Sequence, residues 1–202
     1  MVSELDLTTI TTPILLHLLK NELPFPRLFV LRCKLTVGRF KKSIDPRFPR
    51  ELIELVALPL WVYLNLKKKL GQTKAFEIMR VALLTAGVAK QSLLFDTVAK
   101  GRDFQTFAEQ ELAINKTGTT KWNTLEIVER TDRRFQIKIT RCMYHEIAVT
   151  VGASELTPIV CQIDNAVFNS YLPDKMVFHR GGLNRRIADG NSECHFIWEL
   201  KA

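Results

Sequence analysis

Apolar side chains recur at three- and four-residue spacing along the first 117 residues, the pattern of amphipathic helices. Four helices are expected, at residues 11–24, 49–71, 72–96 and 103–114. The first has Pro13 in its opening turn and is ended by Pro24. The second finishes in three lysines and Gly71, a charge and a residue that favour a helix C-terminus. Together these helices predict a bundle.

The pattern changes after a polar linker at residues 115–123. Two runs that follow alternate apolar with polar residues, as in a hairpin of half-buried strands. Their apolar positions are Leu125 and Ile127 before the turn and Phe135, Ile137 and Ile139 after it. Two short helices, at residues 142–152 and 155–172, and two more strands, at residues 175–183 and 193–200, complete the chain.

The predicted fold class is therefore α+β. A helical N-terminal bundle, residues 1–117, is expected to pack on a C-terminal part, residues 118–202, in which two short helices accompany a small antiparallel sheet. A single compact domain is the alternative, because 202 residues with 47% hydrophobic content can bury one core.

The sequence favours a cytoplasmic location. Its first ten residues carry two acids and no basic residue, unlike a secretory signal. The longest apolar stretch, Leu52–Leu66, is shorter than the ~20 residues of a spanning helix and contains Glu54 and Pro59. We therefore expect a buried helix there, and peripheral attachment is the form of membrane association that stays open.

The net charge of +8 is concentrated between Arg27 and Arg50. This segment has eight lysines and arginines and one acid, Asp45, so its own charge is 8 − 1 = +7. Such a block fits an anionic membrane surface or an acidic protein. Specific nucleic-acid binding is not expected, because no zinc-finger spacing or RNA-binding signature accompanies the charge. Alternatively, most of its apolar residues pack on the bundle and its cations only meet solvent.

The candidate chemistry lies in the last third of the chain, which contains three of the four cysteines. Cys161 and Asp164 are one helical turn apart, beside the apolar stripe of the helix at residues 155–172. Cys142 and His145 are related in the same way on the preceding helix. Each cysteine can also be a small core residue. A buried carboxylate, however, needs a partner or a function, because burying an unpaired charge costs several kcal/mol.

A metal site is one interpretation of these residues. If the strand residue Cys194 faces the two helices, its thiol and those of Cys142 and Cys161 converge. With Asp164 or His145 they would hold iron or zinc. The 18 residues between the first two cysteines and the 32 between the last two match no zinc-ribbon or ferredoxin spacing, so the ligands would come from three separate elements.

Two segments, RCMYHEIAVTVGASELTPIVCQIDNAVF and FHRGGLNRRIADGNSECHFIWEL, form a recognisable pattern. It consists of Arg-Cys then Tyr, Gly before Glu-Leu-Thr-Pro, Cys followed three residues later by Asp, and Gly before a Cys-x-Phe strand. The matching positions are Arg141, Cys142, Tyr144, Gly152, Glu155, Leu156, Pro158, Cys161, Asp164, Gly190, Cys194 and Phe196. The pattern resembles the L-2-amino-thiazoline-4-carboxylic acid hydrolase family over about the last eighty residues.

The resemblance implies a hydrolase that opens a cyclic amidine of the thiazoline type and yields a product like N-carbamoyl-cysteine. Attack of water or a thiolate on the amidine carbon C2 would release the ring sulfur. The catalytic residues would be Cys161, Asp164, Cys142 and His145, and the residues that bind the small-molecule substrate would be Tyr144, Arg180 and Arg185.

Two other classes of protein stay open. One is the metalloprotein described above, in which iron or zinc activates water or a bound ligand. The other is a non-catalytic module that binds a hydrophobic ligand at a membrane surface, with residues 27–50 providing the attachment.

Overall fold

The structure, a computed structural model, describes residues 7–95, 102–183 and 185–201. The chain divides into two compact units. The first contains Met1–Lys90 and Tyr144–Val160, and the second contains Gln91–Met143 and Cys161–Ala202. Each unit therefore combines segments that are distant in sequence.

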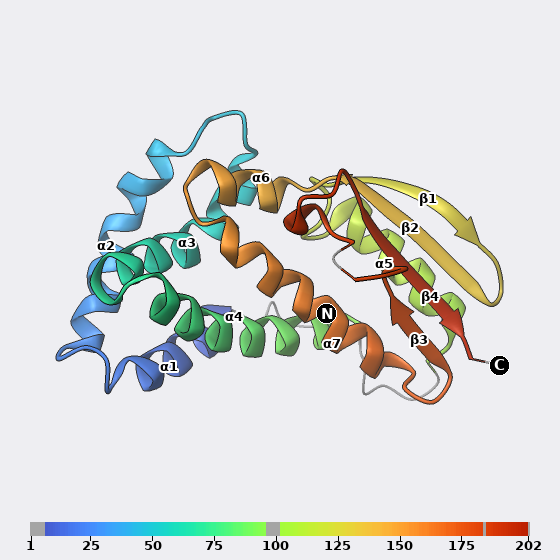
Figure 1. The fold of residues 1–202 in the computed structure, drawn as a ribbon, viewed down its shortest axis with the longest axis horizontal. Coiled ribbons are helices and arrows are strands. Elements are labelled where there is room, and N and C mark those ends of the chain that lie inside the picture. The colour runs from blue at the N-terminus through green and yellow to red at the C-terminus, as the bar shows by residue number, and fades with distance from the viewer. Residues whose placement is uncertain (1–6, 96–101, 184, 202) are drawn as a thin grey trace. The chain divides into compact units, whose positions relative to one another are not determined.

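The first unit is helical (Figure 1). Its elements are α1 (Leu7–Leu19), α2 (Pro26–Ser43), α3 (Arg50–Leu70), most of α4 (Gln72–Leu94), α6 (Met143–Thr150), the 3-10 turn Ser154–Leu156 and the start of α7 (Thr157–Tyr171). Pro26 opens α2, three lysines close α3, and Gly71 follows with a φ of +80°, which favours glycine. The predicted helical N-terminal region is confirmed.

α2 and α3 pack against each other through aromatic and aliphatic side chains. Phe40 stacks on Trp61, with ring centroids 4.9 Å apart. The indole Nε1 of Trp61 donates a hydrogen bond to Oγ1 of Thr36 at 2.8 Å, so the partly buried ring is also satisfied as a donor. Pro59 lies inside α3, which continues to Leu70.

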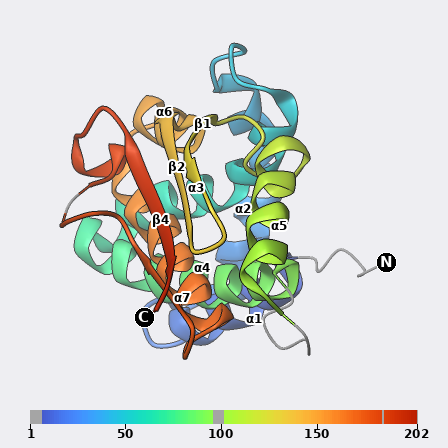
Figure 2. The same ribbon diagram turned by 90° about the vertical axis from the view of Figure 1, so that its right-hand side faces the viewer.

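The second unit is built on a four-stranded antiparallel sheet. Its strands are β1 (Thr124–Arg130), β2 (Arg134–Arg141), β3 (Met176–His179) and β4 (Cys194–Leu200), in the order β1-β2-β4-β3 (Figure 1). α5 (Phe104–Thr117) and the C-terminal part of α7 lie on one face of this sheet (Figure 2). Asp103 caps α5 by accepting the backbone N–H of Thr106 at 2.7 Å. The predicted α+β class is confirmed.

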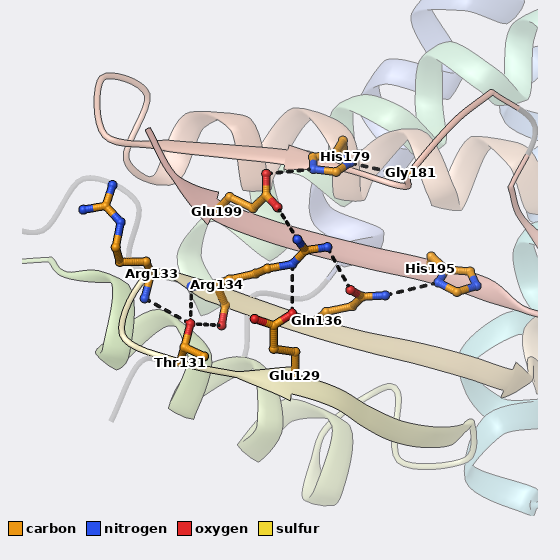
Figure 3. A network of polar contacts seen from close by, with 9 residues as sticks. All are labelled: Glu129, Thr131, Arg133, Arg134, Gln136, His179, Gly181, His195 and Glu199. Carbon is orange, nitrogen blue, oxygen red and sulfur yellow. Dashed lines mark hydrogen bonds and ion pairs between the residues drawn. The ribbon is translucent and has the colours of Figure 1, made fainter. Parts of the chain in front are cut away.

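Alternation along β2 separates the two faces of the sheet. The buried positions are Phe135, Ile137 and Ile139. The opposite face carries a polar network centred on Arg134, which pairs with Glu129 at 3.2 Å and Glu199 at 3.1 Å and donates to Gln136 at 3.1 Å (Figure 3). Gln136 in turn lies 3.4 Å from Nδ1 of His195. The alternation read from the sequence is confirmed for β2. It is wrong for β1: Ile127, an apolar position of the predicted hairpin, is 52% exposed in this edge strand, whose register shifts between Ile127 and Glu129.

Trp198 of β4 lies at the centre of the core of the second unit and is fully buried. Five rings have centroids between 5.1 and 5.8 Å from its own: Phe107, Phe135, Phe168, Phe178 and Phe196. Such pairs contribute about 0.5–1.5 kcal/mol each beyond their area of burial. Since the rings come from α5, α7 and three strands, this cluster holds the two helices against the sheet.

No helix in the described ranges is both long and apolar enough to cross a membrane. The apolar stretch Leu52–Leu66 lies within α3, where Leu52, Leu60 and Leu66 are buried, as predicted. The predicted domain boundary at residue 117 and the packing of the bundle on the sheet stay predictions. The predicted helix end at residue 96 lies outside the described residues.

Candidate active site

α7 carries Cys161 and Asp164, the two residues that the sequence placed one turn apart. The preceding helix, α6, ends at Thr150, and in the turn that follows Gly152 has a φ of +76° and the amide of Ala153 donates to the carbonyl of Ala148 at 2.8 Å. The buried stripe of α7 consists of Ile159, Ile163, Val167, Phe168 and Tyr171. Cys161 and Asp164 flank this stripe and are partly buried.

Asp164 accepts hydrogen bonds from two other elements of the second unit. Nη2 of Arg180, the residue after β3, donates to Oδ2 at 3.1 Å, and Nε2 of Gln91 of α4 donates to Oδ1 at 3.3 Å. The Asp164 side chain is 19% exposed. Burial raises the pKa of Asp164 above its ordinary value, although the charge of Arg180 and both hydrogen bonds oppose the rise. The carboxylate is therefore a stronger base than an exposed aspartate.

The guanidinium of Arg180 has hydrogen-bond donors to spare. It lies 4.1 Å from the ring centroid of Phe196 and 5.3 Å from that of Phe178, and the side chain is only 8% exposed. Its Nε and Nη1 atoms are buried with no hydrogen-bond partner among the described residues. An unsatisfied buried donor costs about 1–3 kcal/mol. A carboxylate or another planar anion is the kind of ligand that such donors fit.

Cys161 and Cys194 lie near the same charges. Burial and the charge of Asp164 raise the pKa of Cys161 to about 12. Burial also raises the pKa of Cys194, although its Sγ accepts the amide N–H of Ile187 at 3.1 Å. Both side chains are therefore thiols at neutral pH, and the thiol is the poorly nucleophilic form of cysteine.

A second carboxyl group, Glu111 on α5, is close enough to Asp164 for their charges to repel. Glu111 is 6% exposed, and Nδ2 of Asn115 donates to its Oε1 at 2.8 Å. Burial, reinforced by Asp164, raises the pKa of Glu111 to about 8. At neutral pH Glu111 is thus mainly protonated and adds no negative charge beside the Asp164–Arg180 ion pair.

The remaining predicted residues are divided between the two units. Cys142 is half-buried between β2 and α6, in the second unit. Tyr144 and His145 belong to the first, where Nδ1 of His145 lies 3.3 Å from Oγ1 of Thr157. Arg185 is exposed. The structure thus groups four of the predicted residues, Cys161, Asp164, Arg180 and Cys194, and the roles of the others stay predictions.

The metal interpretation gains no support from the geometry. Within the part of the chain that the structure describes, no group of three or more His, Cys, Asp or Glu side chains is placed to hold a metal ion. The predicted set of Cys142, Cys161 and Cys194 is accordingly not assembled into a candidate centre for iron or zinc.

Three neighbours of the site were not among the predicted residues. Glu111 continues the buried apolar stripe of α5, so a carboxylate at a core position was the available signal. Gln91 gave no signal, because the sequence around a neutral residue in a long helix does not indicate which distant side chain it will contact. Arg186 forms a two-pronged ion pair with Asp189, at 2.6 and 2.7 Å, and sequence alone does not separate it from the adjacent Arg185.

Comparison with known protein families assigns the chain to one of them. Residues 50–198 match the L-2-amino-thiazoline-4-carboxylic acid hydrolase family, which is more than half of the sequence. The chain belongs to this family, and the resemblance predicted from its C-terminal motifs is confirmed. Every residue from Gln91 to Cys194 that forms the candidate site lies within the matched region.

No curated protein matches the chain. Among solved structures, it is similar to a variant of an Fe(II) unliganded H-NOX protein from K. algicida, with 12% sequence identity over 96% of each chain and a TM-score of 0.38. A similarity at that score supports no statement about fold or function.

Proposed function

We propose that the chain hydrolyses a small cyclic amidine of the thiazoline type, opening its ring, and that a carboxylate on the substrate binds Arg180. Membership of the hydrolase family supports the class of reaction. The single observation that carries the proposal is the buried guanidinium of Arg180, whose Nε and Nη1 have no partner among the described residues.

The charges of the site accommodate one more anion. Asp164 and Arg180 offset each other, and Arg186 is paired with Asp189. Glu111, with a pKa of about 8, adds no charge while it is protonated. A substrate carboxylate at Arg180 gains charge-assisted hydrogen bonds, roughly twice as strong as neutral ones. It also removes the cost of leaving buried donors unsatisfied.

Asp164 is the general base in this proposal. Its carboxylate takes a proton from water as the water oxygen bonds to the amidine carbon C2. The C2–S bond then breaks, and the sulfur leaves as a thiol with that proton. The second water proton passes from the added oxygen to the ring nitrogen N3 as the urea carbonyl forms. One water molecule is consumed, and the product is an N-carbamoyl-cysteine-like thiol. General base catalysis of this kind contributes typically ~10²–10⁴-fold to the rate.

Water, rather than a cysteine, is the nucleophile that this environment favours. The pKa of Cys161, raised by burial and by Asp164 to about 12, keeps the side chain a thiol at neutral pH. A thiolate would be needed for direct attack. Cys161 therefore lies beside the base as a neutral side chain.

The test uses two substrates that differ by one group. Release of thiol from 2-amino-thiazoline-4-carboxylate is followed with a thiol reagent, and the product is identified by mass. 2-Amino-thiazoline, which lacks the carboxylate, is the matched substrate. Arg180→Lys keeps the charge but loses the planar set of donors. We expect it to raise the KM of the carboxylate substrate about 10–100-fold, equivalent to about 1.4–2.8 kcal/mol, and to leave that of 2-amino-thiazoline nearly unchanged.

Arg134→Lys is the control, because Arg134 lies on the polar face of the sheet, paired with Glu129 and Glu199 (Figure 3). It should leave both KM values unchanged. Absence of thiol release by the unaltered chain, or an equal change of KM for both substrates in Arg180→Lys, would contradict the proposal.

A further inference from the structure

α2 has a second apolar surface, separate from the one that packs inside the first unit. Its buried residues are Phe29, Val30, Cys33 and Phe40. Leu28, Leu31 and Leu35, by contrast, are 62%, 52% and 76% exposed, and Phe25, just before the helix, is 69% exposed. Exposed large apolar residues are ordinary when they occur singly. Three on one helix, with a fourth on the residue just before it, require a cause.

The four residues form one continuous stripe. Phe25, Leu28, Leu31 and Leu35 are separated by three, three and four residues, so successive members meet on the same side of the helix. With 3.6 residues per turn, the stripe lies on the side of α2 opposite the buried Cys33. The alternative, in which most apolar residues of the block pack on the bundle, therefore holds for Phe29, Val30 and Phe40 but not for the stripe.

Exposed cations border this stripe of Phe25, Leu28, Leu31 and Leu35, called the leucine stripe below, on both sides. They are Arg32 and Arg39 on one side and Arg27 and Lys34 on the other, with Lys42 following on the next turns. α2 contains no acidic residue. Among the basic residues of α2, Lys41 has an ion pair within the described ranges, to Glu54 of α3. The positive charge of the outer face is therefore not offset by the helix itself.

We propose that the outer face of α2 docks on an anionic membrane surface. The leucine stripe would enter the boundary between headgroups and acyl chains, and the flanking cations would contact the anionic headgroups. An apolar stripe between two rows of cations is the arrangement that interfacial helices use. The charge complementarity decides the partner: a symmetric contact with a second copy would bring two acid-free cationic faces together, with repulsion between them.

The experiment measures co-sedimentation of the full chain with lipid vesicles. Vesicles of phosphatidylcholine with phosphatidylserine are compared with vesicles of phosphatidylcholine alone. We expect binding to the anionic vesicles at low salt, at least about tenfold weaker binding to the neutral ones, and loss of binding at ~1 M salt, where the screening length falls to ~3 Å.

Two variants separate the apolar from the cationic contribution. Leu28→Ser with Leu31→Ser and Leu35→Ser should abolish binding to anionic vesicles. Arg32→Gln with Arg39→Gln should weaken it about 25-fold, since each cation near an anionic surface contributes about fivefold. The thermal unfolding temperature should not change in either variant, because all five side chains are exposed.

Matched controls come from the same unit. Val81→Ser changes an apolar residue of α4 that is 37% exposed, and Lys68→Gln with Lys69→Gln removes two exposed cations at the end of α3. Both should bind as the unaltered chain does. A tryptophan at the stripe, Leu35→Trp, should shift its emission to the blue on anionic vesicles, whereas Val81→Trp should not.

Four outcomes would overturn the inference. The first is that the unaltered chain does not bind anionic vesicles at low salt, and the second is that the triple leucine variant still binds them. The third is that the unaltered chain does not bind vesicles but forms a dimer, which dissociates in the triple leucine variant. The fourth is binding to an acidic protein but not to anionic lipid. Thiol release is measured separately, so failure of this inference does not affect the proposed reaction.

Discussion

Glu155 and Asp164 are two partly buried carboxylates from neighbouring parts of the sequence, one in each unit. Their side chains are similarly exposed, 23% and 19%. Burial alone would raise both pKa values, but Nζ of Lys67, at 2.7 Å, and the hydroxyl of Tyr63 donate to Oε1 of Glu155 and hold its pKa below the ordinary value. The donors to Asp164 do not overcome burial, and its pKa is raised.

The difference shows that exposure alone does not set the pKa of a partly buried carboxylate. The donors around it do. The single hydroxyl proton of Tyr63 is used on Glu155, whose charged form is stabilised. Arg180 gives Asp164 one N–H and keeps Nε and Nη1 unused beside it. The Tyr63 hydroxyl has no proton left for a ligand, whereas the guanidinium of Arg180 has two unused donors that a ligand can fill.

The largest expected effects, on activity and on stability, come from neutralising the two carboxylates one at a time, beginning with Asp164. Asp164→Asn keeps an acceptor for Arg180 but removes the base, so kcat/KM for thiol release should fall about 10²–10⁴-fold. Its free energy of unfolding in urea should change by less than about 1 kcal/mol, because a carboxylate whose pKa is raised by burial is a cost to folding. Activity retained together with a loss above about 3 kcal/mol would make Asp164 structural.

Glu155→Gln is the counterpart of that variant and should behave in the opposite way. Thiol release should be unchanged, and the free energy of unfolding should fall by about 1–3 kcal/mol, because Lys67 and Tyr63 lose a charged acceptor. A strong loss of activity with normal stability would end the contrast between the two carboxylates.

Glu111 makes stability depend on pH. Because its pKa rises from 4.5 to about 8 on folding, the folded chain keeps a proton that the unfolded chain has released. Below pH 4.5 both states are protonated and the effect is absent. Between about pH 4.5 and 8 stability falls as pH rises, by up to about 1.4 kcal/mol per pH unit. Glu111→Gln should remove this part of the slope in urea unfolding.

The matched control for that measurement is Glu109→Gln, on the same helix, whose side chain is 71% exposed. It should keep the slope of the unaltered chain. Identical slopes in the unaltered chain and in Glu111→Gln would show that this carboxyl group is not held protonated by the fold.

The sequence predicted elements and local pairs because both follow from short-range periodicity. Cys161 and Asp164 are one turn apart, and the β2 and β4 runs alternate visibly. The partners of Asp164 were out of reach: Gln91 is 73 residues away, and Glu111 is on another helix. Only the folded chain brings them together, so no local pattern encodes the contact.

α2 shows a second limit of periodicity. The helix has apolar residues on two opposite sides, and the sequence does not say which side packs. Trp61 and α3 settle the question, because the ring that Phe40 meets is supplied by another element. Burial is a property of the assembled unit, whereas spacing reports only that a face exists.

A smaller effect is expected for Tyr63→Phe, which sharpens the account of Glu155. Removing the hydroxyl leaves Lys67 as the donor to the carboxylate. The free energy of unfolding should therefore fall by about 1 kcal/mol. In a Glu155→Gln background the same change should cost clearly less, and a double-mutant cycle measures that coupling. Equal costs in both backgrounds would mean that the hydroxyl acts elsewhere.

The smallest effect is expected for Cys161→Ala, which tests whether the raised pKa of that thiol excludes it from chemistry. With water as nucleophile, kcat should fall less than about tenfold, an amount that loss of packing next to Asp164 explains. Cys33→Ala, which removes a buried thiol of the first unit whose pKa is raised to about 11, is the control and should leave kcat unchanged. A loss of ~10³-fold or more in Cys161→Ala, with an unfolding curve like that of the control, would mean that substrate binding generates the thiolate. Cys161 would then be the nucleophile, and the role of Asp164 would change from activating water to assisting the departure of sulfur.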